Sequence, residues 1–313
     1  MDFSIIIPTF NRESILRSTL ESISFVVEEL NGEIIVVNDY HVPLSITGKD
    51  GITILKNPRK GVASARNYGA EHAKSDFLIF MDDDFLVDKE SIELIIKLSH
   101  MHPDKIFLLN WEYPEKTLKE IKKQKFGRFL IYYNWTSLKG WLGKKEWNSE
   151  QPFMVTNGAS YFLPLFKSDF ESIGGYNEQF PFAGFEDYDF CKRIMQIGKI
   201  FYIYPQKTIL HNESDRVLLE SFLNRRKRDA TTRRFAYEIG YSELELKYSY
   251  FKRIILFFLS VSRKMFLLIA KLIPNKNEFD YFYYKVVNLL IAIEIYNGYN
   301  EFEKKNQVIT SNI

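Results

Sequence analysis

The chain has 313 residues, about twice the length of a typical domain, so one large domain or a domain with an appendage is expected. Lysine and arginine number 42 and aspartate and glutamate 40, and this balance excludes a broad basic face for nucleic acid. Cys191 is the single cysteine, which excludes a disulfide framework and a four-thiolate metal site and favours a reducing compartment.

Apolar runs alternate with helical patterns through the first two hundred residues. Strands are predicted at residues 4–7, 33–37, 52–55 and 77–81, and helices between Asn11 and Leu30, with Asn11 as the cap, and at 61–73. Continuous apolar strands separated by helices are typical of a parallel sheet covered on both faces. The predicted fold class is therefore α/β, a mostly parallel Rossmann-like sheet flanked by helices.

Polar side chains gather where these strands end. Thr9 and Asn11 follow the first strand, Asp39 the second and Asp82–Asp84 the fourth. Since ligands of such sheets bind beyond the carboxyl ends of the strands, this shared position predicts the site. The sequence contains neither G-x-G-x-x-G nor G-x-x-x-x-G-K-[ST], which disfavours a dinucleotide-binding fold of that type and excludes a P-loop.

The run Asp82-Asp83-Asp84 allows two interpretations. Clustered carboxylates repel one another unless a cation lies among them, and a hard divalent ion that also binds a diphosphate would meet that need. The alternative is an exposed acidic loop that caps the helix beginning near Lys89.

A second group of candidates follows later in the chain. Gly174-Gly175 allows a tight turn, and Glu186-Asp187 begins a helix whose dipole stabilises carboxylates as anions. A general base needs a pKa nearer the working pH, so burial or a neighbouring charge would have to oppose the dipole; the alternative is ordinary helix-start acidity. His211 follows a predicted strand at residues 200–203 and a turn at Pro205, and a lone histidine indicates either a metal ligand or a structural residue.

Together these segments resemble family 2 of the inverting glycosyltransferases, which have the GT-A fold. The similarity covers residues 1–215, about two thirds of the chain, in five elements that keep the family's order. The elements are Ser4-Ile5-Ile6-Ile7-Pro8-Thr9-Phe10-Asn11-Arg12; Ile34–Asp39; Gly61–Gly69; Phe80–Asp84; and Gly174-Gly175-Tyr176 with Glu186-Asp187, Arg193, Gly198 and His211.

The resemblance implies a role for each matching position. The cofactor would be Mn²⁺ or Mg²⁺, and the base would deprotonate an acceptor hydroxyl in a single inverting displacement. The implied nucleotide-binding residues are Pro8, Thr9, Phe10, Asn11, Asp39, Arg66, Asp82 and Asp83; the metal ligands are Asp84, Asp82 and His211; the base is Asp187, preceded by Glu186. Asn38 stands where the family commonly has an aspartate, so a thymidine or guanosine donor stays open beside uridine.

All four tryptophans lie in a basic segment at residues 105–150. Trp135 and Trp141 fall where the family has variable acceptor-binding loops, so stacking on acceptor sugars is one interpretation, and packing in a small hydrophobic subdomain is the other. Nearby lysines that would attract acceptor phosphate are Lys139, Lys144 and Lys145.

The remainder is expected to be a helical extension. On a helical wheel of the segment 254–273, the basic side chains fall within an arc of about 120°, opposite an aromatic and aliphatic face. They are Lys252, Arg253, Arg263, Lys264 and Lys271. This pattern fits a helix at a membrane interface or in an oligomer, and the alternative is a hairpin buried on the catalytic domain. No signal-peptide pattern and no run of ~18 apolar residues occur, so neither export nor a membrane-spanning helix is expected. The predicted domains are 1–215 (nucleotide-binding half 1–100, acceptor half 101–215), the extension 216–298 and a flexible tail 299–313.

The leading prediction is a metal-dependent inverting glycosyltransferase in the cytoplasm, peripheral on the inner face of the plasma membrane. It would transfer a sugar, most simply a hexose from UDP, to a lipid-linked or capsular glycan. Its partners would be the nucleotide-sugar donor and the glycan acceptor, with a membrane surface and a second copy as further contacts, and no nucleic acid. Two alternatives stay open: a nucleotidyltransferase that forms sugar nucleotides, although residues 8–12 lack its Gly-rich loop, and a non-catalytic sugar-nucleotide-binding scaffold at membranes.

Overall fold

The computed structural model describes residues 1–46, 51–142, 147–214 and 217–310, with side chains described as far as residue 301. It separates into two compact units. Unit 1 comprises residues 1–115, 134–179 and 186–213, and unit 2 comprises residues 116–133, 180–185 and 214–313. The predicted catalytic domain ended at residue 215, close to the end of unit 1, but residues 116–133 and 180–185 pack with the C-terminal helices instead.

The main sheet of unit 1 has five strands in the order β3-β2-β1-β4-β8. The first four are parallel and the last is antiparallel to β4. Each of β1, β2 and β4 is buried along its whole length, which explains their apolar runs at residues 5–7, 34–37 and 77–81. The strands are β1 (Ser4–Thr9), β2 (Glu33–Asn38), β3 (Ile52–Lys56), β4 (Phe77–Met81) and β8 (Phe162–Phe166).

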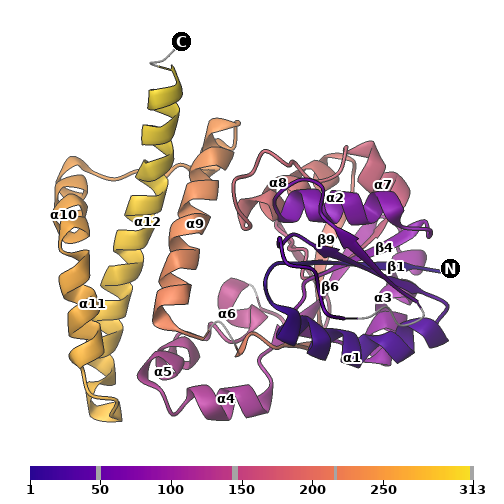
Figure 1. Ribbon diagram of the computed structural model, residues 1–313, viewed down its shortest axis with the longest axis horizontal. Helices are drawn as coiled ribbons and strands as arrows, with labels where there is room; N and C mark the ends of the chain where they lie inside the picture. Colours follow the sequence, from indigo (N-terminus) through magenta and orange to yellow (C-terminus); the bar gives the residue numbers. More distant parts are fainter. Residues whose placement is uncertain (47–50, 143–146, 215–216, 311–313) are drawn as a thin grey trace. The chain divides into compact units, whose positions relative to one another are not determined.

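Helices cover both faces of this sheet, as predicted. Helix α1 (Glu13–Glu29) and helix α2 (Val62–His72) lie on opposite sides of β1 and β4 (Figure 1). Helix α2 approaches the sheet closely at Gly69, where an added Cβ would lie 2.4 Å from Ile6 Cγ2. Further helices of unit 1 are α3 (Lys89–Met101), α6 (Leu138–Leu142), α7 (Lys167–Ser172) and α8 (Phe185–Gln196).

Two predicted helix caps differ from the structure. Arg12, not Asn11, occupies the N-cap position of α1, and no side chain caps that helix. Asn11 has a φ of 53° and so ends the turn after β1 in the left-handed region. Helix α3 is capped by Asp88, whose carboxylate accepts from Ser91 N, and not by Asp82–Asp84.

A second sheet pairs the end of β9 with β5, the short strand that follows β4. Its order is β5-β9-β6, with β7 also paired to β9, and the strands are β5 (Phe85–Leu86), β6 (Lys105–Glu112), β7 (Phe153–Val155) and β9 (Ile200–His211). The sequence predicted that this last strand ends at residue 203, but it continues because Pro205–Lys207 is accommodated as a bulge against β6. His211 consequently lies on the strand itself, paired with Phe85.

Unit 2 is helical. In Figure 1 the helix α12 (Asp280–Thr310) lies between α9 (Leu219–Glu238) and the pair α10 (Tyr250–Val261) and α11 (Arg263–Leu272). Helices α4 (Glu115–Ile121) and α5 (Lys125–Tyr132) also belong to this unit, except for Glu115, which falls in unit 1. The predicted single helix at 254–273 is two helices that meet at Ser262, and the segment predicted as a tail from residue 299 continues α12 to Thr310. Among the described residues, no helix combines the length and hydrophobicity needed to cross a membrane.

Candidate functional site

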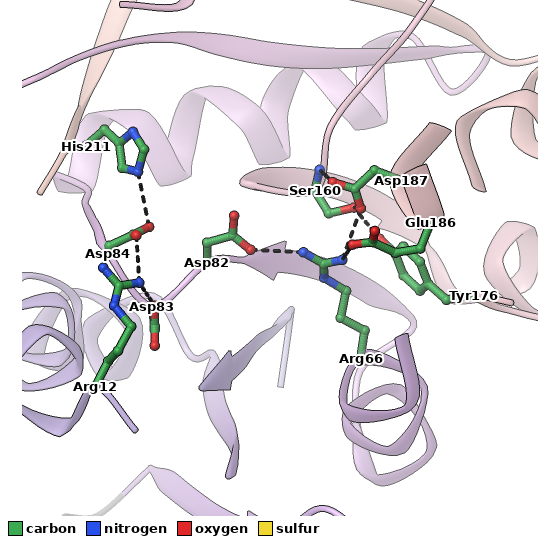
Figure 2. A network of polar contacts seen from close by, with 10 residues as sticks. All are labelled: Arg12, Arg66, Asp82, Asp83, Asp84, Ser160, Tyr176, Glu186, Asp187 and His211. Atoms are coloured by element: carbon green, nitrogen blue, oxygen red, sulfur yellow. Dashed lines mark hydrogen bonds and ion pairs between the residues drawn. The ribbon is translucent and has the colours of Figure 1, made fainter. Parts of the chain in front are cut away.

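Several of the predicted site residues form two neighbouring clusters in unit 1, each built around a buried arginine. Arg66 of α2 holds one cluster and Arg12, at the start of α1, holds the other. Figure 2 shows Asp82 between them, on the segment that follows β4. The run of three aspartates thus supplies both clusters.

Arg66 joins three carboxylates from distant parts of the chain. Its Nη1 donates to Glu186 Oε1 and Asp187 Oδ1, both at 3.0 Å, and its Nη2 donates to Asp82 Oδ1 at 2.9 Å. The Arg66 side chain is only 3% exposed. Burial opposes its charge, but the surrounding carboxylates, Asp187 first, hold the pKa of Arg66 well above its ordinary value.

Asp187 is oriented by two further groups. Its Oδ1 accepts from Ser160 Oγ at 2.6 Å, and its Oδ2 accepts the longer bond from Ser160 N at 3.2 Å. The Ser160 hydroxyl also meets the Tyr176 hydroxyl at 2.6 Å. Tyr176 stacks on Phe190 with ring centroids 4.0 Å apart, and burial raises the pKa of its phenol well above the ordinary value. This rigid support leaves Oδ2 of Asp187 as the less engaged oxygen.

Asp82 is the most accessible of the three consecutive aspartates. Its side chain is 38% exposed, against 7% for Asp83 and 5% for Asp84. Desolvation is the largest cause that raises the pKa of Asp82 to about 6; Arg66 opposes this, and the nearby Asp84 and Asp187 carboxylates add to it.

Arg12 holds the other two aspartates. Its Nη1 lies 2.6 Å from Asp83 Oδ1 and 2.7 Å from Asp84 Oδ2. The second oxygen of Asp83 accepts from Thr9 Oγ1 at 2.6 Å. Both oxygens of Asp83 are therefore engaged by the protein, and since Asp83 and Asp84 are buried, neither belongs to an exposed acidic loop.

Asp84, His211 and Glu213 form the group best suited to hold a metal ion among the described residues. One ligand atom from each lies within 4.8 Å of the other two. His211 Nε2 is 3.4 Å from Asp84 Oδ1, and Tyr113 donates to Glu213 Oε2 at 2.7 Å. Two carboxylates and an imidazole are ligands that suit a divalent first-row metal, so these residues fit such an ion. Glu213 was missed by sequence reasoning, although its spacing of two residues from His211 was a usable signal.

Aromatic rings fix the His211 imidazole in place. It stacks on Phe85 with centroids 4.4 Å apart and meets the edge of Trp111 at 4.9 Å. Trp111 in turn contacts Trp141 at 6.5 Å, and Trp141 contacts Trp135 at 5.5 Å. The two tryptophans predicted to bind the acceptor are thus linked to His211 through Trp111 by a series of ring contacts. Trp141 is 48% exposed. Lys144 and Lys145 lie outside the described residues.

The remaining predicted nucleotide-binding residues lie at the ends of β1 and β2. Pro8 is within β1 and pairs with Val37. Asp39 accepts from Asn57 Nδ2 at 2.7 Å and from Gly61 N at 3.0 Å, so its carboxylate is anchored to the start of α2. Phe10 is 57% exposed and lies edge-on to Tyr40, with centroids 5.1 Å apart.

The Gly174-Gly175-Tyr176 turn has a clear structural reason. Gly174 and Gly175 have φ values of 73° and 70°, which favour glycine. The turn is held by Asn67, whose Nδ2 donates to the Tyr176 carbonyl at 2.9 Å and whose Oδ1 accepts from Tyr176 N at 2.8 Å. Since Tyr176 meets Ser160, this turn supports Asp187 indirectly.

Comparison with known proteins identifies the family. The model of glycosyl transferase family 2 matches residues 4–170, more than half of the chain. The chain belongs to glycosyl transferase family 2. A second model, described as the N-terminal domain of galactosyltransferase, matches residues 153–213, the part that contains Ser160, Asp187 and His211.

Individual relatives are similar over only part of their length. An uncharacterized glycosyltransferase of Haemophilus influenzae is 27% identical over 198 residues, which are 62% of each protein. The minor teichoic acid biosynthesis protein GgaB of Bacillus subtilis is 33% identical over 114 residues, 34% of this chain and 13% of GgaB. The match therefore spans less than two thirds of either relative.

Solved structures give weaker similarity. S. aureus TarS 1–349 aligns with a TM-score of 0.49 and 14% identity over 98% of this chain and 92% of that one. GalNAc-T7 with UDP, GalNAc and Mn²⁺ aligns with a TM-score of 0.47 and 15% identity over 67% of this chain and 43% of that one. With the family established, the predicted GT-A fold, a mostly parallel sheet flanked by helices with a helical C-terminal part, is confirmed.

Proposed function

We propose that the protein is a metal-dependent, inverting glycosyltransferase that moves a hexose from UDP to a hydroxyl of a teichoic-acid-type cell-surface glycan in the cytoplasm. The observation that carries the proposal is the Arg66 cluster. In this cluster one guanidinium, that of Arg66, binds both Asp82, at the end of β4, and Asp187, at the start of α8. A donor-binding carboxylate and a base for the acceptor belong on either side of the sugar that is transferred.

Asp187 is the proposed general base. It is 19% exposed, and its Oδ2 is the oxygen with fewer partners, so an acceptor hydroxyl can approach it. Arg66 and Ser160 fix the other oxygen, which keeps the carboxylate from rotating. Asp187 takes the proton as the hydroxyl attacks the anomeric carbon from the face opposite the leaving diphosphate. One displacement without a covalent intermediate inverts the configuration.

The nucleotide would lie across the ends of β1 and β2. Asp39 is anchored by Asn57 and Gly61 and would accept from a ring N–H of uracil, while the exposed ring of Phe10 supplies an apolar face for the base. Asp82, the accessible aspartate, would face the ribose and the metal. Arg66 is bound to three carboxylates, so we assign it to orienting them and not to the diphosphate.

Asp84, His211 and Glu213 would hold the ion, with Asp82 directed at the bound nucleotide. A nitrogen ligand in this group favours Mn²⁺ over Mg²⁺, which prefers oxygen ligands. When bound, the ion neutralises negative charge on the departing nucleoside diphosphate. The acceptor is proposed from GgaB, whose name places it in teichoic acid biosynthesis, and Trp135 and Trp141 would stack on acceptor sugars.

The test compares Asp187→Asn with Asp189→Asn. Asp189 lies on the same helix but pairs with Arg193, so it serves as the matched control. We expect Asp187→Asn to lower kcat by roughly 10²–10⁴, the usual contribution of a general base, and to leave UDP affinity nearly unchanged. Asp189→Asn should keep most of the transfer activity. Product stereochemistry by NMR tests inversion, and an Asp187→Asn enzyme with normal turnover would refute the assignment.

A further inference from the structure

Helix α10 of unit 2 leaves almost all of its apolar surface uncovered. Leu256 is its only buried side chain. Seven of its twelve residues are large hydrophobic side chains with exposed fractions of 38% to 77%. They are Tyr250, Phe251, Ile254, Ile255, Phe257, Phe258 and Val261. Exposed apolar area of this extent on one helix requires a covering partner.

These side chains form one continuous face. At ~100° per residue they span an arc of about 160° centred opposite Leu256. Lys252 and Arg253 are exposed at the two edges of the arc, between the apolar face and the side that packs on the protein. This is the arrangement of an interfacial helix, in which lysine and arginine extend from the flanks toward a polar boundary.

Helix α11 also leaves apolar side chains exposed. Ala270 is its only buried residue, and Met265, Leu268 and Leu272 are 52%, 56% and 72% exposed. Lys264 is exposed at the edge of this group. We call the exposed residues of α10 and α11 the α10–α11 face.

The charge around this face has one sign. Between Glu245 and Glu278 the chain has no aspartate or glutamate and seven lysines or arginines. Three of the seven have acidic partners in unit 2: Arg263 pairs with Glu294, Lys271 lies 3.2 Å from Glu220, and Lys247 lies 3.3 Å from Glu245. The other four are Lys252, Arg253, Lys264 and Lys276.

We propose that the α10–α11 face binds the surface of an anionic lipid bilayer, with both helices lying in the interface. A second copy is the poorer occupant, because a two-fold contact through this face would bring the same basic side chains together without acidic partners within the face. A bilayer with anionic headgroups matches both features, since it accepts the aromatic and aliphatic side chains and neutralises the flanking cations. The inference does not depend on the proposed catalytic activity.

The experiment is flotation of the full-length protein with vesicles of phosphatidylcholine, alone or mixed with phosphatidylglycerol. We expect binding to the mixed vesicles that weakens with added salt. Phe251→Ser with Phe258→Ser should reduce partitioning at least tenfold, about 1.4 kcal/mol. Lys252→Gln with Arg253→Gln should reduce it about fivefold per charge, since each basic residue at such a surface contributes about 1 kcal/mol.

The matched control is Phe25→Ser on α1 of unit 1. Phe25 is 75% exposed, as Phe251 is 77% exposed, but lies outside the face, so its replacement should leave partitioning unchanged. Equal binding by the Phe251/Phe258 variant, or no binding to anionic vesicles, overturns the proposal. So does light scattering that shows a dimer which the same variant dissociates. Donor hydrolysis in solution should stay normal in all these variants, which separates a failure here from a failure of the proposed catalytic function.

Discussion

Replacing Arg66 by methionine tests how the candidate site is held together. Methionine keeps an unbranched apolar side chain but removes the charge shared by three carboxylates. Removing one partner of a buried ion pair costs about 3–5 kcal/mol. Glu186 is 2% exposed and Asp187 19%, so they contribute most of this cost, whereas Asp82, at 38%, is partly screened by solvent. We therefore expect a loss of about 3 kcal/mol, the lower end of that range.

The assay is thermal unfolding monitored by fluorescence and by calorimetry. For a unit of this size, 1 kcal/mol corresponds to roughly 2–4 °C, so the midpoint of unit 1 should fall by roughly 6–12 °C. A double-mutant cycle with Glu186→Gln then isolates the pair. In the native background Glu186→Gln should be destabilising, and in the Arg66→Met background it should be neutral or stabilising, because it removes a buried charge that has lost its cation.

Two results would refute this reasoning. The first is an Arg66→Met protein whose midpoint equals that of the native protein. The second is a Glu186→Gln substitution with the same cost in both backgrounds, which would mean that the two side chains are not energetically coupled. Arg66→Lys is the conservative variant: it keeps the charge but not the forked geometry, so it should recover stability more than turnover.

Four further predictions concern single side chains. Glu213→Gln should weaken Mn²⁺ binding by at least tenfold in calorimetric titration, since ligand-shell changes commonly cost 10–100-fold; unchanged affinity would remove Glu213 from the metal group. Phe10→Ala should weaken UDP binding by about 1 kcal/mol or more, measured by titration, without lowering the unfolding midpoint, because the ring is 57% exposed. Cys191 is 1% exposed and burial raises the pKa of its thiol, so iodoacetamide should label it only after urea unfolding; rapid labelling of the native protein would contradict the buried thiol. Trp141→Ala should raise the acceptor KM and leave the donor KM unchanged in steady-state kinetics, and the reverse pattern would exclude acceptor stacking.

Much of unit 1 could be predicted from the sequence because its strands are buried on both faces. A strand such as β4 (Phe77–Met81) must then be continuously apolar, and its end is visible where the first aspartate appears. The position of Asp82 beyond a strand end follows from that alone. The Gly174-Gly175 turn was visible for a similar reason, since both residues need positive φ.

Features that depend on long-range packing were not visible. Pro205 looks like the end of a strand, yet the bulge opposite β6 carries β9 to His211. No periodicity shows that residues 116–133 pack with the C-terminal helices. The role of Arg66 was also hidden, because its three partners are 16, 120 and 121 residues away in the chain.

The need of the three consecutive aspartates for a cation could be predicted from the sequence, but the source of that cation could not. Such a run does require a cation, and the protein itself provides two, since Arg66 pairs with Asp82 and Arg12 pairs with Asp83 and Asp84. Pairing with Arg12 accounts for the burial of the last two aspartates before any metal is considered.

The charge of the whole site still favours a divalent ion. The two clusters and the metal-ligand group contain six carboxylates against the two guanidiniums. A nucleoside diphosphate adds further negative charge when it binds. Unless a divalent cation binds with it, the negatively charged donor must approach a site that is itself negatively charged. Nucleotide binding and metal binding should therefore be coupled. The absence of such coupling, seen as equal UDP affinity with and without Mn²⁺, would mean that the two arginines alone balance the site.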